Sequence, residues 1–427
     1  MEVTMAAAAP IQQAQARVDY AAVNRRLRYR AGRLVADDGA LELRTVLQPV
    51  FSVRHQRPVG CEALIRGRDA LGRAVGACEI FARATRWDEL ELDRLCAALH
   101  VRNFGAIAGE RNWLFLNLSA AEFNLRAWDD GFFTELLGRA GLAPHQIVVE
   151  ILESPVSSSV DLREVIAHFR ALGVLVALDD FGAGHSNFER IWQLKPDIVK
   201  LDRSFIVLAE RDPAMSRSLP SIVDILHQHR CLVVAEGIET ERQAVHAMSA
   251  GVDLVQGFYF AQPFEISGEF FPQRIDWSRL QDGLQETVGS GTMILRKNLI
   301  AHLARMYGVV EQYREQGSFG DRVARLFELP GVIRCYAIDG SGLQTSENLE
   351  SPRLSTSKDP RLGPLASAEG ASWYSRPYFR RAKQSPGEIQ ISREYLSCAD
   401  ASMCVTLSVL VDAPQGPMVL CCDLLAE

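Results

Sequence analysis

Eight short apolar runs recur along residues 45–261, each five to nine residues long and most separated by stretches with helical periodicity. Several runs are apolar through their middles, which is typical of strands buried on both faces. The runs span residues 45–53, 60–67, 113–119, 147–153, 174–180, 198–202, 232–239 and 254–261. A chain in which apolar strands alternate with helical stretches must bury the strands beneath the helices.

The intervening stretches have the spacing of amphipathic helices. Residues 161–173 place five apolar side chains on one face and end in Gly173, and residues 216–230 form a second such stretch. Eight strands with helical crossovers over about 220 residues predict an α/β fold, a (β/α)8 TIM-type barrel. The link 54–60 is too short for a helical crossover, so the first two strands are expected to be antiparallel.

The 427 residues exceed one ordinary core, which favours two domains. Glycine and serine gather around a boundary in 267–292. Residues 331–427 then alternate strand patterns with turns, which predicts a small α+β domain with an antiparallel sheet. We expect a peripheral segment (1–40), the barrel (41–270), a linker with a connecting helix (271–317) and the small domain (318–427).

The connecting helix is predicted at 294–316, because Leu295, Leu299, Leu303, Met306, Val310 and Tyr313 share one stripe. The stripe allows two interpretations. The helix packs on its own domain, or it also pairs with a second copy in a dimer.

Composition narrows the setting. The formal net charge of -7 argues against non-specific binding to nucleic acid or anionic lipid. Nine scattered cysteines without a CxxC pair favour reduced thiols over a zinc site or a disulfide framework. The N-terminus lacks a basic region ahead of its short apolar patch, and no apolar run approaches a membrane span. We therefore expect a cytoplasmic protein with no membrane span.

Polar side chains interrupt the apolar runs at the carboxyl ends of seven consecutive predicted strands. Functional groups of (β/α)8 barrels lie at those ends. A single such residue is usually a satisfied buried polar group, but recurrence at equivalent positions favours one shared site. The residues are Glu62, Asn117, Glu150, Asp179 with Asp180, Lys200, Glu236 and Gln256.

The oxygen-rich set Glu62, Asn117, Glu150, Asp179, Asp180 and Glu236 predicts a metal centre. Carboxylate and amide oxygens without His or Cys favour Mg²⁺ or Mn²⁺. The adjacent aspartates of the stretch "LDDFGAG" (178–184) are then tolerated because they hold two ions, an arrangement suited to attack on a phosphodiester. The glycines after them allow a sharp turn and close approach to a ligand.

Three further residues fit phosphodiester chemistry, each with a plainer alternative. Lys200 is suited to positioning a water or stabilising phosphate charge, or it forms a simple salt bridge with Asp202 or another neighbour. Arg66 is suited to gripping a phosphate, or it is an ordinary surface or ion-pair arginine. Glu239 orients Lys200 or a water, or it caps a loop. His168 and His185 lack partners at metal spacing and are interpreted as structural or surface residues.

Seven segments together resemble the EAL-domain cyclic di-GMP phosphodiesterases. The likeness covers about residues 40–265, with the segments in the family's order. They read "CEALIRG" (61–67), "LNLS" (116–119), "EILES" (150–154), "DDFGAG" (179–184), "KPDIVKLDRSFI" (195–206), "AEGIET" (235–240) and "VQGFYFA" (255–261).

This resemblance implies roles for individual residues. It implies metal ligation by Glu62, Asn117, Glu150, Asp179, Asp180 and Glu236. It implies catalysis by Lys200, Glu236, Glu239 and Glu62, and substrate binding by Leu64, Arg66 and Gln256. Glu153, Phe181, Gly182 and Gly184 match the lid loop and its anchor, although the chain has Ala183 and His185 where the family commonly has a Thr and an aromatic residue.

Residues 371–397 resemble a ligand-binding segment of PAS-like, Cache-type sensor domains. The resemblance implies a small-molecule pocket near Trp373, Tyr374, Arg376 and Tyr378, which are otherwise core and surface residues. No GGDEF-type segment is found, so synthesis of the dinucleotide is not expected.

The resemblance implies hydrolysis of cyclic di-GMP to linear pGpG with two ions of Mg²⁺ or Mn²⁺, in a homodimer regulated by the C-terminal domain. Two alternatives stay open. One is a catalytically silent cyclic di-GMP receptor, and the other is a phosphodiesterase for another nucleotide.

Overall fold

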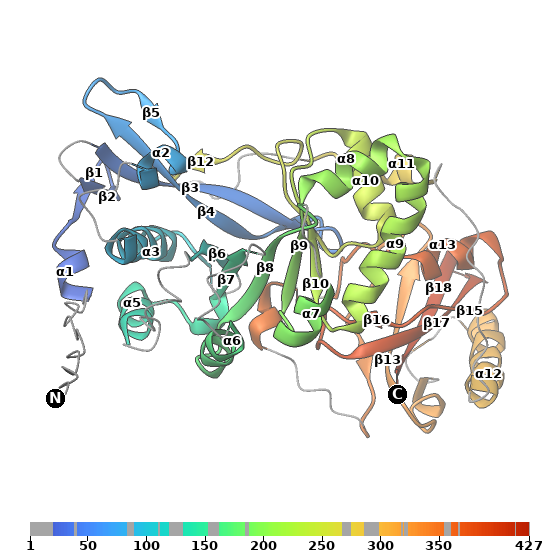
Figure 1. The fold of residues 1–427 in the computed structure, drawn as a ribbon. Helices are drawn as coiled ribbons and strands as arrows, with labels where there is room; N and C mark the ends of the chain where they lie inside the picture. The colour runs from blue at the N-terminus through green and yellow to red at the C-terminus, as the bar shows by residue number, and fades with distance from the viewer. Residues whose placement is uncertain are drawn as a thin grey trace, which may run out of the picture.

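The computed structural model describes most of the chain. The described residues are 20–37, 41–82, 89–109, 112–118, 131–152, 162–183, 188–266, 275–285, 299–316, 319, 323–353, 360–365, 368–414 and 416–426. Two bodies of secondary structure are visible, a strand-and-helix barrel and a C-terminal antiparallel sheet (Figure 1).

Eight strands close into a barrel in the order β3-β11-β10-β9-β8-β7-β6-β4, and β4 pairs back onto β3. Six of them run parallel, from β4 through β6, β7, β8, β9 and β10. β11 continues parallel to β10, whereas β3 is antiparallel to both β4 and β11. The strands are β3 (Leu41–Ser52), β4 (Arg57–Asp69), β6 (Trp113–Asn117), β7 (Ile147–Leu152), β8 (Leu175–Phe181), β9 (Ile198–Leu201), β10 (Leu232–Ala235) and β11 (Leu254–Val255).

Helices surround the barrel (Figure 1). They bury their apolar faces against the outward-facing side chains of the strands, as the amphipathic spacing of 161–173 and 216–230 predicts. The helices are α2 (Ala77–Ala82), α3 (Glu89–Gly105), α5 (Phe132–Ala140), α6 (Leu162–Ala171), α7 (Phe188–Leu194), α8 (Arg203–Arg211), α9 (Pro213–Gln228), α10 (Glu241–Ala250) and α11 (Trp277–Gln285).

The last predicted strand is shorter than expected. The run 254–261 is paired only at Leu254 and Val255, and the chain turns at Gly257. Gly257 has φ of 153° and touches the backbone of Ile238, where a Cβ would come within 2.1 Å of the carbonyl oxygen. This close approach bends the chain out of the sheet.

The N-terminal segment also differs from the peripheral piece expected for 1–40. After α1 (Tyr20–Asn24), the chain forms a hairpin of β1 (Leu27–Arg30) and β2 (Arg33–Asp37). β2 pairs antiparallel with β3, so this hairpin extends the barrel sheet. The sheet is completed by β5 (Ala74–Val75), which pairs with β4, and β12 (Phe264–Glu265), which pairs with β3.

The C-terminal sheet is antiparallel, in the order β14-β13-β18-β17-β15 with β16 also on β17. Helix α12 (Ile300–Gln316) covers it, burying Met306, Val309, Val310 and Tyr313. The helix therefore packs on its own domain. The other elements are η5 (Val323–Arg325), β13 (Val332–Asp339), β14 (Leu349–Glu350), η6 (Pro360–Leu365), α13 (Pro377–Gln384), β15 (Gln390–Ile391), β16 (Tyr395–Leu396), β17 (Met403–Ala413) and β18 (Gly416–Leu425).

The barrel interior continues into the C-terminal part. Inward side chains such as Trp113 and Phe115 form one buried cluster with Leu362 and Leu365 of η6 and Leu396 of β16. The Trp113 indole donates a 2.8 Å hydrogen bond to the Arg361 carbonyl. The C-terminal part therefore closes one end of the barrel.

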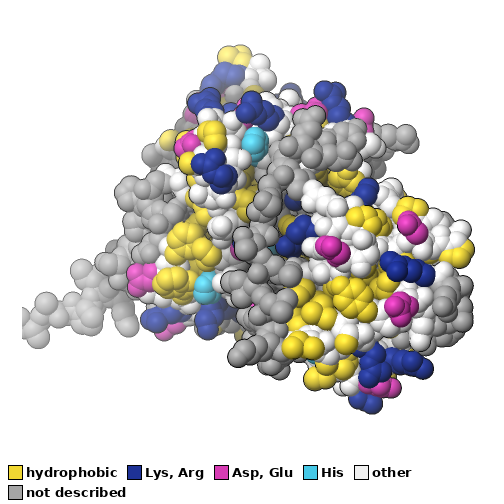
Figure 2. Space-filling model, turned by 90° about the vertical axis from the view of Figure 1, so that its right-hand side faces the viewer, with side chains coloured by type: hydrophobic (Ala, Val, Ile, Leu, Met, Phe, Trp, Pro, Cys, Tyr) yellow, Lys and Arg dark blue, Asp and Glu magenta, His cyan; other side chains and the backbone are white. Residues whose placement is uncertain are grey.

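The surface side chains and the cysteines can be compared with what the composition predicts. Seen from the side of the C-terminal sheet, several hydrophobic side chains adjoin one another in the lower right part of the view, with charged side chains around them (Figure 2). All nine cysteines are free, and only Cys78 is exposed. No helix among the described residues is long and apolar enough to cross a membrane.

Candidate active site

A strict alternation along the barrel strands builds the site. Residues that fill the barrel interior, such as Val148, Ile198 and Val234, are each followed two positions later by a polar residue, here Glu150, Lys200 and Glu236. Because strand side chains alternate between the two faces, those polar residues also point inward, one layer nearer the carboxyl ends. Asn117, Asp179 and Gln256 follow Phe115, Ala177 and Leu254 in the same way.

The inward layer forms an acidic cluster around one lysine, here defined as Glu62, Glu150, Asp179 and Glu236 around Lys200. Lys200 Nζ lies 2.7 Å from Glu236 Oε1, 3.1 Å from Asp179 Oδ1 and 3.6 Å from Glu62 Oε2, and it also pairs with Glu150. Lys200 and Glu150 are each 1% exposed. One buried cation therefore faces four carboxylates.

This imbalance sets the pKa values of the cluster. Burial, reinforced by the neighbouring carboxylates and opposed by Lys200, raises the pKa of Glu236 to about 8 and that of Glu150 well above its usual range. Burial lowers the pKa of Lys200, but attraction to Glu150 and Glu236 more than offsets this and leaves it well above its usual value. Lys200 therefore keeps its proton, but this single positive charge cannot neutralise all four carboxylates.

Two amide side chains hold Glu62. Asn117 donates a 3.1 Å hydrogen bond to Glu62 Oε1, and Gln256 donates a 2.8 Å bond to Glu62 Oε2. Both carboxylate oxygens are thereby oriented, one by the last residue of β6 and the other by the residue just after β11. The buried Gln256 thus serves to position Glu62.

The cluster fits a hard cation. Glu62, Glu150 and Glu236 each offer an oxygen within 4.8 Å of those of the other two. Glu150 Oε2 is buried and has no hydrogen-bond partner among the described residues. An all-oxygen donor set with excess negative charge and an unused buried oxygen matches what Mg²⁺, Mn²⁺ or Ca²⁺ requires.

Asp180, near the end of β8, and Gly182, just after β8, both have positive φ angles. Asp180 is exposed overall and has φ of 55°, while partial burial of its carboxyl group and the neighbouring Asp179 raise its pKa. Phe181 is buried and stacks on Phe205 with ring centroids 6.2 Å apart. Gly182 has φ of 106°, and a Cβ there would come within 1.7 Å of the Phe205 ring. The predicted lid residues Glu153 and Gly184 lie outside the described residues, as does His185.

The remaining predicted residues lie around the cluster. Leu64 and Arg66 share the half-buried face of β4 with Glu62, and Arg66 donates to the Ile65 carbonyl at 2.8 Å. Glu239 pairs with Arg203 at 2.7 Å and is not among the four carboxylates that contact Lys200. His168 lies on α6 beside Phe169, on the outside of the barrel.

Sequence reasoning missed the opposite mouth of the barrel. Asp253, which immediately precedes β11, pairs with Arg376 at 3.2 Å, and Asp197 pairs with Arg361 at 2.9 Å. An aspartate immediately before each of two buried strands was the available signal. Arg54, in the turn between β3 and β4, was interpreted only as part of a short link.

Comparison with protein families agrees with the site. Residues 35–263, just over half of the chain, match the family model described as EAL domain. The match spans all eight barrel strands and every member of the acidic cluster.

Curated relatives share the barrel region. Cyclic di-GMP phosphodiesterase NbdA of Pseudomonas aeruginosa is 30% identical over 240 residues, covering 54% of this chain and 30% of NbdA. Cyclic di-GMP phosphodiesterase PdeL of Escherichia coli is 25% identical over 235 residues, covering 52% of this chain and 62% of PdeL. This chain therefore spans less than two thirds of either relative.

One solved structure aligns with most of this chain. The Bacillus subtilis YkuI protein, which has an EAL domain and was solved in complex with substrate c-di-GMP and calcium, is 24% identical to this chain, with a TM-score of 0.49. That alignment covers 90% of this chain and 96% of YkuI.

Proposed function

Since the chain belongs to the EAL domain family, we propose that it hydrolyses cyclic di-GMP to linear pGpG. The observation that carries this proposal is the acidic cluster, four carboxylates around buried Lys200 at the carboxyl mouth of the barrel. The names of NbdA and PdeL, both cyclic di-GMP phosphodiesterases, support the choice of substrate.

We propose that two ions of Mg²⁺ or Mn²⁺ are held by Glu62, Glu150 and Glu236, with Asn117, Asp179 and Asp180 completing the ligand set. Bound divalent ions lower the pKa of a coordinated water and offset the charge of the phosphate. The excess of carboxylates and the unused Glu150 Oε2 support this set.

The protein's own residues would orient the reaction. Lys200, fully buried and protonated, fixes the carboxylates, and an N–H group that they release on ion binding would donate to a water or a phosphate oxygen. Gln256 and Asn117 hold Glu62 in one orientation, so that its oxygens need no rearrangement during turnover. Arg66, four residues beyond Glu62 on the same strand face, is placed to grip a non-scissile phosphate.

The segment that leaves β8 would form one wall of the substrate cleft. Phe181 anchors it in the core through Phe205 and Phe188, while Gly182 allows the sharp turn. We propose that this anchored turn is the base of the lid loop, with Leu64 lining the cleft opposite. Glu239, bound to Arg203, is proposed to act on the catalytic water only after that pair has opened.

The assembly extends the proposal. The C-terminal sheet with α12 and α13 is proposed to be a PAS-like domain that binds a small molecule and regulates the barrel. We further propose a cytoplasmic homodimer, consistent with nine free thiols and with exposed Ile300 and Tyr307 on α12. We propose domain limits near 27–285 and 299–426, which the hairpin that extends the barrel sheet and the packing of α12 support.

The test is product analysis. The full chain, incubated with cyclic di-GMP and Mg²⁺ or Mn²⁺, should release pGpG, and Glu62→Gln should abolish the product while the fold is retained. Glu135→Gln, which removes only a surface ion pair with Arg139, is the matched control. Tight binding without product would instead identify a receptor, and preference for another cyclic dinucleotide in competition would change the substrate.

A further inference from the structure

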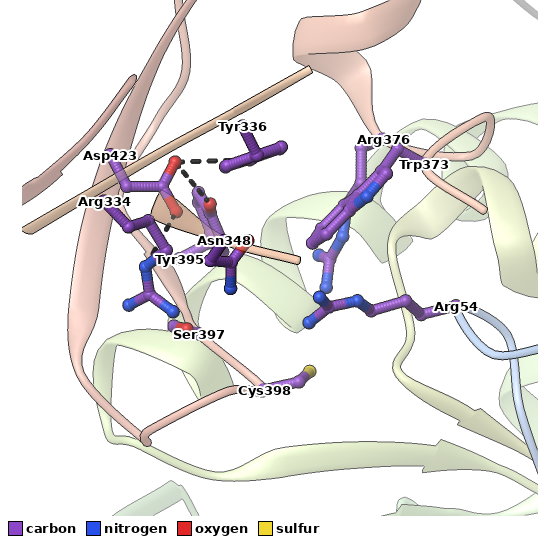
Figure 3. A pocket seen from close by; sticks show the side chains of 10 residues that line it. All are labelled: Arg54, Arg334, Tyr336, Asn348, Trp373, Arg376, Tyr395, Ser397, Cys398 and Asp423. Carbon is purple, nitrogen blue, oxygen red and sulfur yellow. Dashed lines mark hydrogen bonds and ion pairs between the residues drawn. The ribbon is translucent and has the colours of Figure 1, made fainter. Parts of the chain in front are cut away.

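A small pocket lies where the C-terminal sheet meets the closed end of the barrel (Figure 3). Its open volume is about 10 Å³, room for about one water molecule, so a larger group would enter only if the lining side chains move apart. Three arginines line it, Arg54 from the barrel and Arg334 and Arg376 from the C-terminal part. We call it the junction pocket, defined by the ten residues labelled in Figure 3.

Two of the three arginines are paired with carboxylates. Arg334 contacts Asp400 at 2.7 Å and Asp423 at 3.3 Å. Arg376 contacts Asp253 at 3.2 Å and lies over the Tyr395 ring. The carboxylates in contact with Arg334 and Arg376 therefore neutralise their positive charges.

Arg54 is different. Its side chain is 6% exposed, and its Nε is buried with no hydrogen-bond partner among the described residues. Among the described residues no carboxylate lies within salt-bridge distance of it, although Asp423, which pairs with Arg334, also interacts with it electrostatically. Burial is the largest cause that lowers the pKa of Arg54. A buried guanidinium whose N–H groups lack a hydrogen-bonded acceptor is costly, so its retention in a pocket calls for a reason.

Stacking holds Arg54 in place without using its donors. Its guanidinium lies over the Trp373 ring, 3.9 Å from the centroid, and the Trp373 ring also stacks with Tyr336 at a centroid distance of 5.3 Å. The Trp373 indole is fixed by a 2.8 Å bond to Gln344. Stacking engages the face of a guanidinium, whereas its N–H groups lie in the plane and stay available.

We propose that the junction pocket binds a compact oxyanion, a carboxylate or phosphate group, through the free N–H donors of Arg54. Planar guanidinium forks match these groups in bidentate geometry. In Figure 3 the Arg54 head group points into the space between Arg376 and the Asp423 and Arg334 pair. Because Arg54 belongs to the barrel and the other walls to the C-terminal part, the anion would bind across their contact.

The pocket gives the proposed regulatory domain a ligand class and a location. The regulatory role of the pocket rests on the proposed function of the C-terminal domain, but anion binding can be measured without any turnover of cyclic di-GMP. Failure of the anion site would therefore leave the hydrolase proposal untouched, and the reverse also holds.

Direct binding tests the proposal. The full chain, kept free of divalent metal with a chelator and at constant ionic strength, is titrated by calorimetry with inorganic phosphate and, separately, with succinate. Saturable binding of at least one probe is expected, weakened at least tenfold in Arg54→Gln. Arg57→Gln is the matched control, because Arg57 lies in the same link but bonds to the Pro364 carbonyl. Saturable binding of neither probe, or unchanged binding in Arg54→Gln, would overturn the site.

Thermal unfolding gives a second measurement that does not depend on the fold of one variant. Arg54→Met removes the unmatched charge, so in anion-free buffer its Tm should equal or exceed that of the wild type. The probe that binds should raise the wild-type Tm by several degrees and leave that of Arg54→Met unchanged. If Arg54→Met has a lower Tm and neither probe shifts the wild-type Tm, then Arg54 only stabilises the fold by stacking on Trp373, and the proposal is wrong.

Discussion

Asp253 immediately precedes the two-residue strand β11 and Gln256 immediately follows it, so their side chains make contacts at opposite ends of the barrel. Asp253 holds Arg376 of the C-terminal part at 3.2 Å, and Gln256 holds Glu62 of the acidic cluster at 2.8 Å. Three residues of strand span about 10 Å. The contact with the C-terminal part and the positioning of a catalytic carboxylate therefore share one short, rigid segment.

This relationship predicts that Arg376→Gln lowers turnover although Arg376 lies far from the acidic cluster. Loss of the ion pair leaves Asp253 buried with fewer partners, which shifts β11 and with it Gln256. A two- to thirtyfold fall in kcat is expected, the range of typical coupling energies. Steady-state assays of pGpG release measure it.

The control for that effect is Arg393→Gln. Arg393 also joins the C-terminal part to the barrel, through Asp224 on α9 at 2.7 Å, but the pair is exposed and does not involve β11. Its kcat should match the wild type within a factor of two. Equal losses in both variants would mean that general loosening of the domain contact, not β11, is responsible.

Lys200→Met should abolish turnover and also destabilise the fold. The substitution leaves four carboxylates around an apolar side chain, and loss of one partner from a buried ionic cluster typically costs about 3–5 kcal/mol. Saturating Mg²⁺ should restore more Tm in this variant than in the wild type, because cations then replace the missing charge. A thermal-shift titration measures both, and an equal Mg²⁺ response in the two proteins would contradict metal binding by the cluster.

Gly182→Ala should destabilise the protein by about 1–3 kcal/mol through φ strain, with further loss from the clash with Phe205. Gly131→Ala separates the two terms. Gly131 has φ of 83° with open space around it, so only the backbone strain applies. Urea unfolding of both variants should show the larger loss at Gly182, and equal losses would mean that the Phe205 contact is not tight.

Much of the acidic cluster could be predicted from sequence, because the barrel strands impose one simple geometry. Alternation in a buried strand fixes which face Glu150, Lys200 and Glu236 take, and parallel register brings equivalent positions to one mouth. The barrel, its helices and the antiparallel C-terminal sheet follow from the same periodicities.

What sequence could not supply was the contact between the two parts. Arg54 lies in a loop, where no periodicity predicts the direction of its side chain, and its partner Trp373 is about 320 residues away. The end of the last strand at Val255 depends on one backbone contact between Gly257 and Ile238. Such contacts depend on the final packing and leave no local pattern.

His100 predicts how stability changes with pH. Its Nδ1 lies 2.9 Å from Thr45 Oγ1 in the core, and burial, with a smaller contribution from Arg66, lowers its pKa to about 3. An unfolded histidine titrates near 6.5, so between those values the unfolded chain binds a proton that the folded protein does not. Stability is therefore fully present above the unfolded pKa and is lost as pH falls.

The size of this loss is about 1.4 kcal/mol per pH unit below the unfolded pKa. Urea unfolding at about pH 7.5 and about pH 5.5 measures it. His100→Gln should lose about 1.4 kcal/mol less than the wild type over that interval, since glutamine does not titrate. Equal losses would show that His100 becomes protonated in the folded state.

Leu365→Ala should destabilise the barrel itself, although Leu365 belongs to the C-terminal part. Leu365 is 1% exposed within the cluster that contains Trp113 and Leu254 of the barrel interior, and a Leu→Ala change in a core costs about 2–5 kcal/mol. In a urea series, pGpG release should fail at a lower urea concentration than in the wild type. Leu349→Ala, in the separate cluster beneath α12, should shift loss of activity less. Unchanged activity loss in Leu365→Ala would mean that the barrel core is stable without its C-terminal closure.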